Sequence, residues 1–193
     1  MSKTLLELLG GPDPLREIKV LPPYQIYCDM DGVLCDFKGR FEHFTGMHPR
    51  AYEDRYGKTP FWNLIDNEVG LVFWSKMSWT PGGKMLWNFI KPYKPQLLTS
   101  PSRADHSRLG KNVWVKENLN PQPKVNFRRA KDKQDFANEN SILIDDREDT
   151  IERWNNAGGI GIHHPSPNTP NTCLLYTSPS PRDRTRSRMP SSA

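Results

Sequence analysis

Three short apolar segments, each ending in polar residues, limit what this chain can fold into more than any other feature. They are YQIYCDMDG at 24–32, PQLLTS at 95–100 and ILIDD at 142–146. Each has the length and apolar content of a buried strand, and stretches with helical spacing separate them. Strands that alternate with helices predict a mostly parallel sheet with helices on both faces. We therefore expect an α/β fold.

The remaining segments complete this pattern. The spacing predicts helices at 105–119, 131–140 and 147–159, a weak strand at 124–127 and a final strand at 159–164.

The stretch from 39 to 91 is aromatic, has helical periodicity and is broken by Gly and Pro, which predicts a small helical cap inserted after the first strand. A length of 193 residues fits one domain with such an insertion. We divide the chain into an N-terminal extension (1–23), a catalytic core (24–38 and 92–172), the cap (39–91) and a tail (173–193).

The net charge of +5 does not by itself indicate a nucleic-acid partner, because four Arg and one Asp lie in residues 173–193. The Ser, Pro and Arg-rich composition of this tail predicts disorder, with a basic nucleic-acid-binding arm as the functional alternative. We favour a third interpretation. The run CLLYTSPSPRD is the translation of a sequence that resembles the transposase adapter of sequencing libraries. We then expect the natural chain to end near Thr172, followed by read-through.

No apolar run approaches the roughly 18–20 residues needed to span a bilayer, so we expect a cytoplasmic protein without a membrane partner. The three cysteines have neither CxxC nor Cys/His spacing, which argues against a zinc site or a disulfide framework.

The polar ends of the predicted strands indicate a metal site. If the strands are parallel, their carboxyl ends meet at one edge of the sheet, where ligands bind in such folds. The residues brought there are Asp29, Asp31, Thr99, Ser100, Asp145 and Asp146. Four crowded carboxylates repel one another unless a cation lies among them, and hard oxygen ligands favour Mg²⁺. A DxD pair alone is also found in solvated turns and helix caps, and that alternative stays open for Asp29 and Asp31.

Four motifs in order give the chain a family resemblance. DMDGVLCDF, LLTS, a lysine in AKDKQDFA and ILIDDRED resemble the four motifs of the haloacid dehalogenase-like (HAD) phosphatases, over about Tyr24 to His164. Within that superfamily, SWTPGGKMLWNFI and LIDDREDTIERWNNAGG are similar to the 5'(3')-deoxyribonucleotidase group of phage and bacterial type. The resemblance implies a HAD-like Rossmannoid sheet with a helical cap.

The resemblance also implies residue roles. Asp29 is expected to be the nucleophile and Asp31 the general acid and base. The metal ligands would be Asp29, Asp146 and the backbone carbonyl of Asp31, with Asp145 holding the lysine from outside the metal shell. Phosphate would be bound by Thr99, Ser100 and one lysine, for which Lys133 is favoured over Lys131.

The aromatic cap is expected to shape the leaving-group pocket. Its candidates for stacking on a nucleobase are Phe61, Trp62, Phe73, Trp74 and Trp79.

The resemblance thus implies a Mg²⁺-dependent phosphomonoesterase of deoxyribonucleotide catabolism that acts on nucleoside monophosphates. The alternatives are a polynucleotide 3'-phosphatase, another small-molecule HAD phosphatase, or a DxD protein that binds a metal-nucleotide without hydrolysing it. We do not expect nucleic acid as a partner, and a monomer and a homodimer both stay open.

Overall fold

The computed structural model describes residues 24–165 and contains a five-stranded sheet in the order β3-β2-β1-β4-β5. All neighbouring strands are parallel. The strands are β1 (Gln25–Cys28), β2 (Gln96–Thr99), β3 (Val125–Phe127), β4 (Ser141–Asp145) and β5 (Ile160–His163). The predicted parallel α/β fold is confirmed. The predictions for residues 1–23 and for the tail from 173 onward lie outside the described residues.

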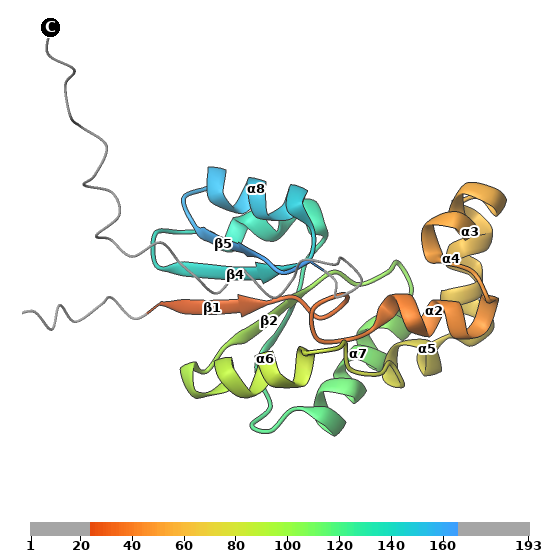
Figure 1. The fold of residues 1–193 in the computed structure, drawn as a ribbon, viewed down its shortest axis with the longest axis horizontal. Coiled ribbons are helices and arrows are strands. Elements are labelled where there is room, and N and C mark those ends of the chain that lie inside the picture. Colours follow the sequence, from red (N-terminus) through yellow and green to blue (C-terminus); the bar gives the residue numbers. More distant parts are fainter. Residues whose placement is uncertain (1–23, 166–193) are drawn as a thin grey trace, which may run out of the picture.

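Helices cover both faces of the sheet, because successive strand residues point to opposite sides. Cys28, Leu97 and Ile144 belong to the hydrophobic cluster on one face, and Leu98 and Leu143 to that on the other. The first face packs against α6 (Gly83–Ile90) and α7 (Asp105–Asn118), and the second against η3 (Ala130–Phe136) and α8 (Glu148–Asn156) (Figure 1). The core therefore has two apolar layers with the sheet between them.

The helical insertion lies beyond the carboxyl end of β1 (Figure 1). It contains α2 (Phe37–Thr45), α3 (Pro49–Tyr56), α4 (Lys58–Asn63), the π-helix η1 (Leu64–Val69) and α5 (Leu71–Ser75). Glycines with positive φ end three of these elements, which is why the helices are short: Gly46 (+64°), Gly57 (+87°) and Gly70 (+60°).

Helix α6 falls within the range predicted for the cap, 39–91, but it lies along the sheet (Figure 1). Its buried residues Leu86, Trp87 and Ile90 belong to the same cluster as Leu97 of β2. A short 3₁₀ turn, η2 (Lys91–Tyr93), then leads into β2.

Within residues 24–165, no helix is both long enough and apolar enough to cross a membrane.

Candidate active site

Acidic residues from two neighbouring strands converge at the carboxyl edge of the sheet. Asp29 follows β1, and its backbone N–H donates to Ile144 O of β4 (2.9 Å). This pairing places Asp29 beside Asp145 and Asp146. One carboxylate oxygen from each of the three lies within 4.8 Å of the others. The structure thus brings together three of the predicted carboxylates.

The crowding of these carboxylates changes their pKa values. Burial, followed by repulsion from Asp29 and Asp145, raises the pKa of Asp146 to about 8. Burial and the charge of Asp29 raise the pKa of Asp145 to about 6, although Lys133 opposes this. A cation among the oxygens would relieve both penalties. The cluster holds hard oxygen ligands and no sulfur or imidazole among the described residues, so it fits Mg²⁺.

Lys133 is the lysine that reaches the cluster. Its side chain is 1% exposed, and Nζ lies 2.7 Å from Asp145 Oδ2 and 3.0 Å from Asp29 Oδ1. Burial would lower the pKa of Lys133, but the two carboxylates outweigh it and the pKa lies above its usual value. Lys131, the alternative within the same motif, is exposed. Asp145 therefore holds Lys133 in place, the arrangement expected from the resemblance.

A second buried lysine, Lys111 of α7, joins the site and was missed from the sequence. Its Nζ donates to Asp31 Oδ2 (2.7 Å), Thr99 Oγ1 (2.7 Å) and Ser100 O (2.8 Å). It also lies 5.1 Å from the centre of the Trp74 ring. One signal was present: Lys111 interrupts the buried face of its helix, where the other members are Ser107, Gly110, Trp114 and Val115.

Asp31 lies between this lysine and the acidic cluster. Burial raises the pKa of Asp31, and the Lys111 ammonium opposes the rise. Asp31 Oδ1 is buried without a hydrogen-bond partner among residues 24–165, and Ser100 Oγ is in the same state. Buried polar atoms without partners are uncommon, and these two are free to form a hydrogen bond with a polar ligand.

Gly32 allows the chain to turn away immediately after Asp31. Its φ is +79°, and a Cβ atom there would lie 2.1 Å from Asp146 Oδ2. The N–H groups of Leu34 and Cys35 then donate to Met30 O, both at 2.8 Å. The turn from β1 therefore passes directly against the acidic cluster, with no room for a side chain.

The five aromatic candidates for a base pocket differ in exposure. Phe61 (5%), Phe73 (0%) and Trp74 (1%) lie in the hydrophobic core. Trp62 is 41% exposed. Trp79 is partly buried. Its backbone forms an isolated β-bridge with Cys35, and the backbone of Cys35 forms another with Asp31. Of this set, Trp62 is exposed and Trp79 is partly buried, whereas the other three lie in the core.

Cysteine chemistry is not supported at this site. Cys28 and Cys35 are fully buried. Burial and the nearby carboxylates raise the pKa of both thiols well above the usual value. A nucleophilic cysteine requires the opposite shift.

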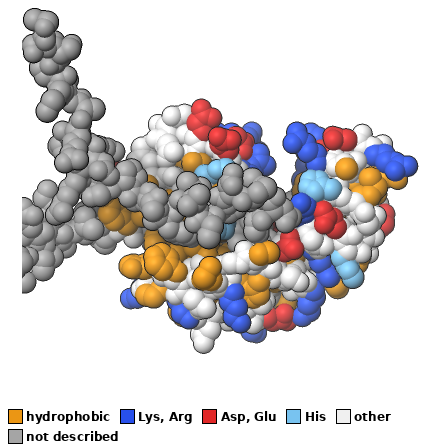
Figure 2. Space-filling view, in the orientation of Figure 1, with side chains coloured by type: hydrophobic (Ala, Val, Ile, Leu, Met, Phe, Trp, Pro, Cys, Tyr) orange, Lys and Arg blue, Asp and Glu red, His pale blue; other side chains and the backbone are white. Residues whose placement is uncertain are grey.

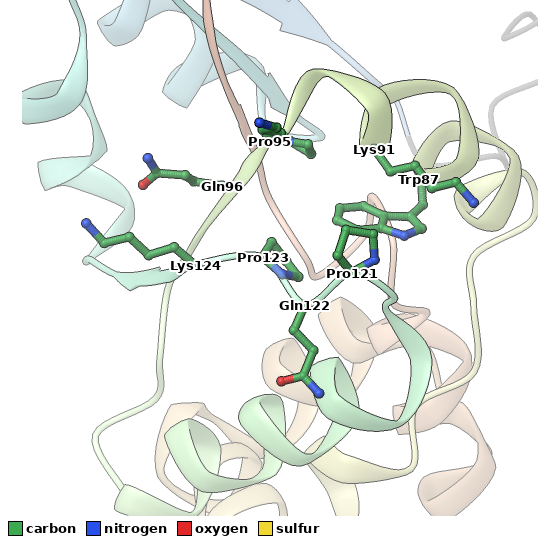
Figure 3. A pocket seen from close by; sticks show the side chains of 9 residues that line it. Trp87, Lys91, Pro95, Gln96, Pro121, Gln122, Pro123 and Lys124 are labelled. Atoms are coloured by element: carbon green, nitrogen blue, oxygen red, sulfur yellow. The ribbon is translucent and has the colours of Figure 1, made fainter.

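The surface is hollowed between the part that carries α8 and the part that carries α3 and α4, with Lys or Arg side chains on both sides (Figure 2). A separate cavity of about 350 Å³ lies at the amino end of β2, lined by Trp87, Pro95 and Lys124 among others. There the side chains of Lys91 and Lys124 point in opposite directions (Figure 3), so they do not form a joint anion site.

Neither a protein-family model nor a curated protein matches the sequence. Solved structures show a general likeness. A HAD family enzyme from Bacteroides thetaiotaomicron, in complex with magnesium, is 14% identical with a TM-score of 0.46, covering 77% of this chain and 96% of that chain. A hydrolase from Streptococcus pneumoniae is 17% identical with a TM-score of 0.41, covering 72% and 92%. At these identities and TM-scores the likeness assigns neither a family nor a substrate.

Proposed function

We propose that this protein is a Mg²⁺-dependent phosphomonoesterase that works through an aspartyl-phosphate on Asp29. The observation that carries the proposal is the arrangement around Asp29: a buried carboxylate next to Asp31, two further carboxylates and the ammonium of Lys133. The motif order seen in the sequence supports the same chemistry. When bound, Mg²⁺ would be held by Asp29 and Asp146 and would offset charge on the phosphate.

In the first step, the Asp29 carboxylate attacks phosphorus and the bond to the leaving-group oxygen breaks. Asp31 gives its proton to that oxygen, and burial, which raises the pKa of Asp31, favours the protonated form. In the second step, Asp31 takes a proton from water as the water attacks phosphorus. Inorganic phosphate leaves and Asp29 regains its carboxylate.

Two lysines and a hydroxyl are placed to bind the transferred group. Lys133 contacts Asp29 and Lys111 contacts Asp31, and both would neutralise charge that develops on the phosphoryl oxygens. Ser100 Oγ, which has no partner within the described part of the chain, is available to donate to one of these oxygens.

For the substrate we propose nucleoside monophosphates, with deoxyribonucleotides first. The similarity of two sequence segments to the 5'(3')-deoxyribonucleotidase group supports this choice. The aromatic candidates for contact with a base are Trp62, which is exposed, and Trp79, which is partly buried.

The test is phosphate release from a panel of deoxynucleoside and ribonucleoside monophosphates, with Mg²⁺ and with EDTA. We expect turnover with Mg²⁺, loss with EDTA and loss in Asp29→Asn. The matched control is Asp54→Asn, at an exposed cap position. Undiminished turnover in Asp29→Asn would refute the nucleophile.

Two further substrates separate the alternatives. Release from an oligonucleotide 3'-phosphate, with strong salt dependence, would favour a polynucleotide phosphatase. Sugar-nucleotide binding without any phosphate release would contradict the hydrolase proposal.

A further inference from the structure

Asp66 is a buried carboxylate outside the catalytic cluster, and no cation pairs with it in the described part of the chain. It is 7% exposed and belongs to η1. The N–H of Gly70 donates to Ile65 O (3.0 Å), an i to i+5 bond, and such π-turns are frequent at functional sites. A buried carboxylate destabilises a protein unless it is hydrogen-bonded, so its partners indicate its role.

The side-chain partner of Asp66 is Ser102. Ser102 Oγ donates to Asp66 Oδ1 at 2.7 Å and accepts from the N–H of Ala104 at 3.3 Å. We call residues 99–102 the phosphate loop. Pro101, whose ring fixes φ, connects Ser102 to Ser100. The hydrogen bond thus ties the cap to the end of this loop.

Helix α7 fixes the other side of the phosphate loop. His106 Nδ1 lies 3.0 Å from the backbone oxygen of Asp66, and Lys111 on the same helix binds Thr99 Oγ1 and Ser100 O. The helix packs so closely against α5 that a Cβ atom on Gly110 would lie 2.5 Å from Trp74 Cβ. Asp66 and α7 therefore hold the loop between them.

We propose that Asp66 is a positioning residue for the phosphate loop. By accepting from Ser102, it keeps the loop in the conformation that presents the free hydroxyl of Ser100 to the phosphoryl group. This inference rests on the proposed phosphatase function and adds to it a contact between the cap and the phosphate-binding backbone. Asp66 itself does not touch the reacting atoms.

The experiment compares Ser102→Ala, Asp66→Ala, Asp66→Asn and the double alanine variant. Asn67→Ala, the exposed next residue of η1, is the control. The readouts are the inhibition constant of inorganic phosphate and kcat and KM for p-nitrophenyl phosphate, whose leaving group is small. We expect each alanine variant to weaken phosphate binding roughly tenfold, the scale of one charge-assisted hydrogen bond. The double variant should be no worse than either single one.

Asp66→Asn keeps an acceptor for Ser102 and should retain most of the affinity for phosphate, while Asn67→Ala should match the wild type. Additive effects in the double variant would overturn the proposal. So would a defect that appears with nucleotides but not with p-nitrophenyl phosphate, since Asp66 would then act on the leaving group.

A second measurement does not depend on turnover. Amide hydrogen exchange at Ala104, whose N–H donates to Ser102 Oγ, should be faster in Asp66→Ala than in the wild type, and unchanged exchange would overturn the proposal. If the wild type hydrolyses no phosphomonoester, the proposed function fails, whereas hydrogen exchange still decides whether Asp66 holds the loop.

Discussion

The two buried lysines offset the charge of different carboxylates. Lys133 contacts Asp29 and Asp145, whereas Lys111 contacts Asp31 and the phosphate loop. A buried ammonium costs desolvation free energy, and here each one has charged or polar partners that offset it. Each lysine can therefore be tested separately.

Lys133→Met should lower kcat by about 10²–10³, the usual effect of removing one donor that stabilises transition-state charge. Lys131→Met is the matched control, because Lys131 lies on the same 3₁₀ segment and is exposed. Steady-state kinetics on both variants checks the assignment. Equal losses in the two variants would contradict it.

Lys111→Met should both destabilise the protein and lower kcat. It leaves Asp31, whose side chain is 25% exposed, without its cation, so we expect a loss below the about 3–5 kcal/mol that breaking a fully buried pair costs. Urea unfolding measures the stability, and kinetics at a temperature where the variant is folded measures the activity. The result that contradicts a role at the site is full activity in the folded fraction.

At the scale of elements, the turn after β1 and the π-helix of the cap carry the geometry of the site. Both depend on glycines in conformations that other residues rarely adopt: Gly32 in the turn and Gly70 at the end of η1.

Comparing Gly32→Ala with Gly46→Ala distinguishes the effect of backbone strain from the effect of crowding at the acidic cluster. The added Cβ atom would meet Asp146 Oδ2, so we expect lost activity and weakened Mg²⁺ binding in addition to destabilisation. Gly46→Ala is the control, because its φ is also positive but nothing lies within 4 Å of the added atom. It should cost only about 1 kcal/mol of left-handed strain and leave activity intact. Thermal unfolding and a Mg²⁺ titration compare the two, and equal effects would contradict a specific role for Gly32.

At the scale of the whole molecule, the acidic cluster links stability to pH. In the metal-free protein the pKa of Asp146 is raised from 3.8 to about 8. The protonated side chain therefore adds to the free energy of unfolding below about pH 4, and this stabilisation is lost as the pH rises through 8. We expect the Tm in EDTA to fall between about pH 4 and 8 relative to Asp146→Asn, which lacks the titrating group. Mg²⁺ should reverse the fall by binding the ionised form. A Tm difference independent of pH would contradict this.

The strand ends were predictable from the sequence because a parallel sheet brings every carboxyl end to one edge. Asp29, Asp145, Asp146 and Thr99 are recognisable as the last residues of apolar runs, without knowledge of the strand order. The helix at 105–119 and the glycine-closed helix after β4 were also predicted, since their apolar spacing is local.

The sequence by itself therefore determined the parallel α/β architecture and most of the acidic cluster, because periodicity and strand polarity are properties of neighbouring residues. Only the tertiary structure decided that Lys111 enters the site, that Lys133 rather than Lys131 reaches Asp29, and that Phe73 and Trp74 lie in the core. Those outcomes depend on which helix face packs against which element, and such packing joins residues far apart in the chain: Lys111 meets Asp31 across eighty positions. No pattern of neighbouring residues shows which residues so far apart in the sequence will be in contact.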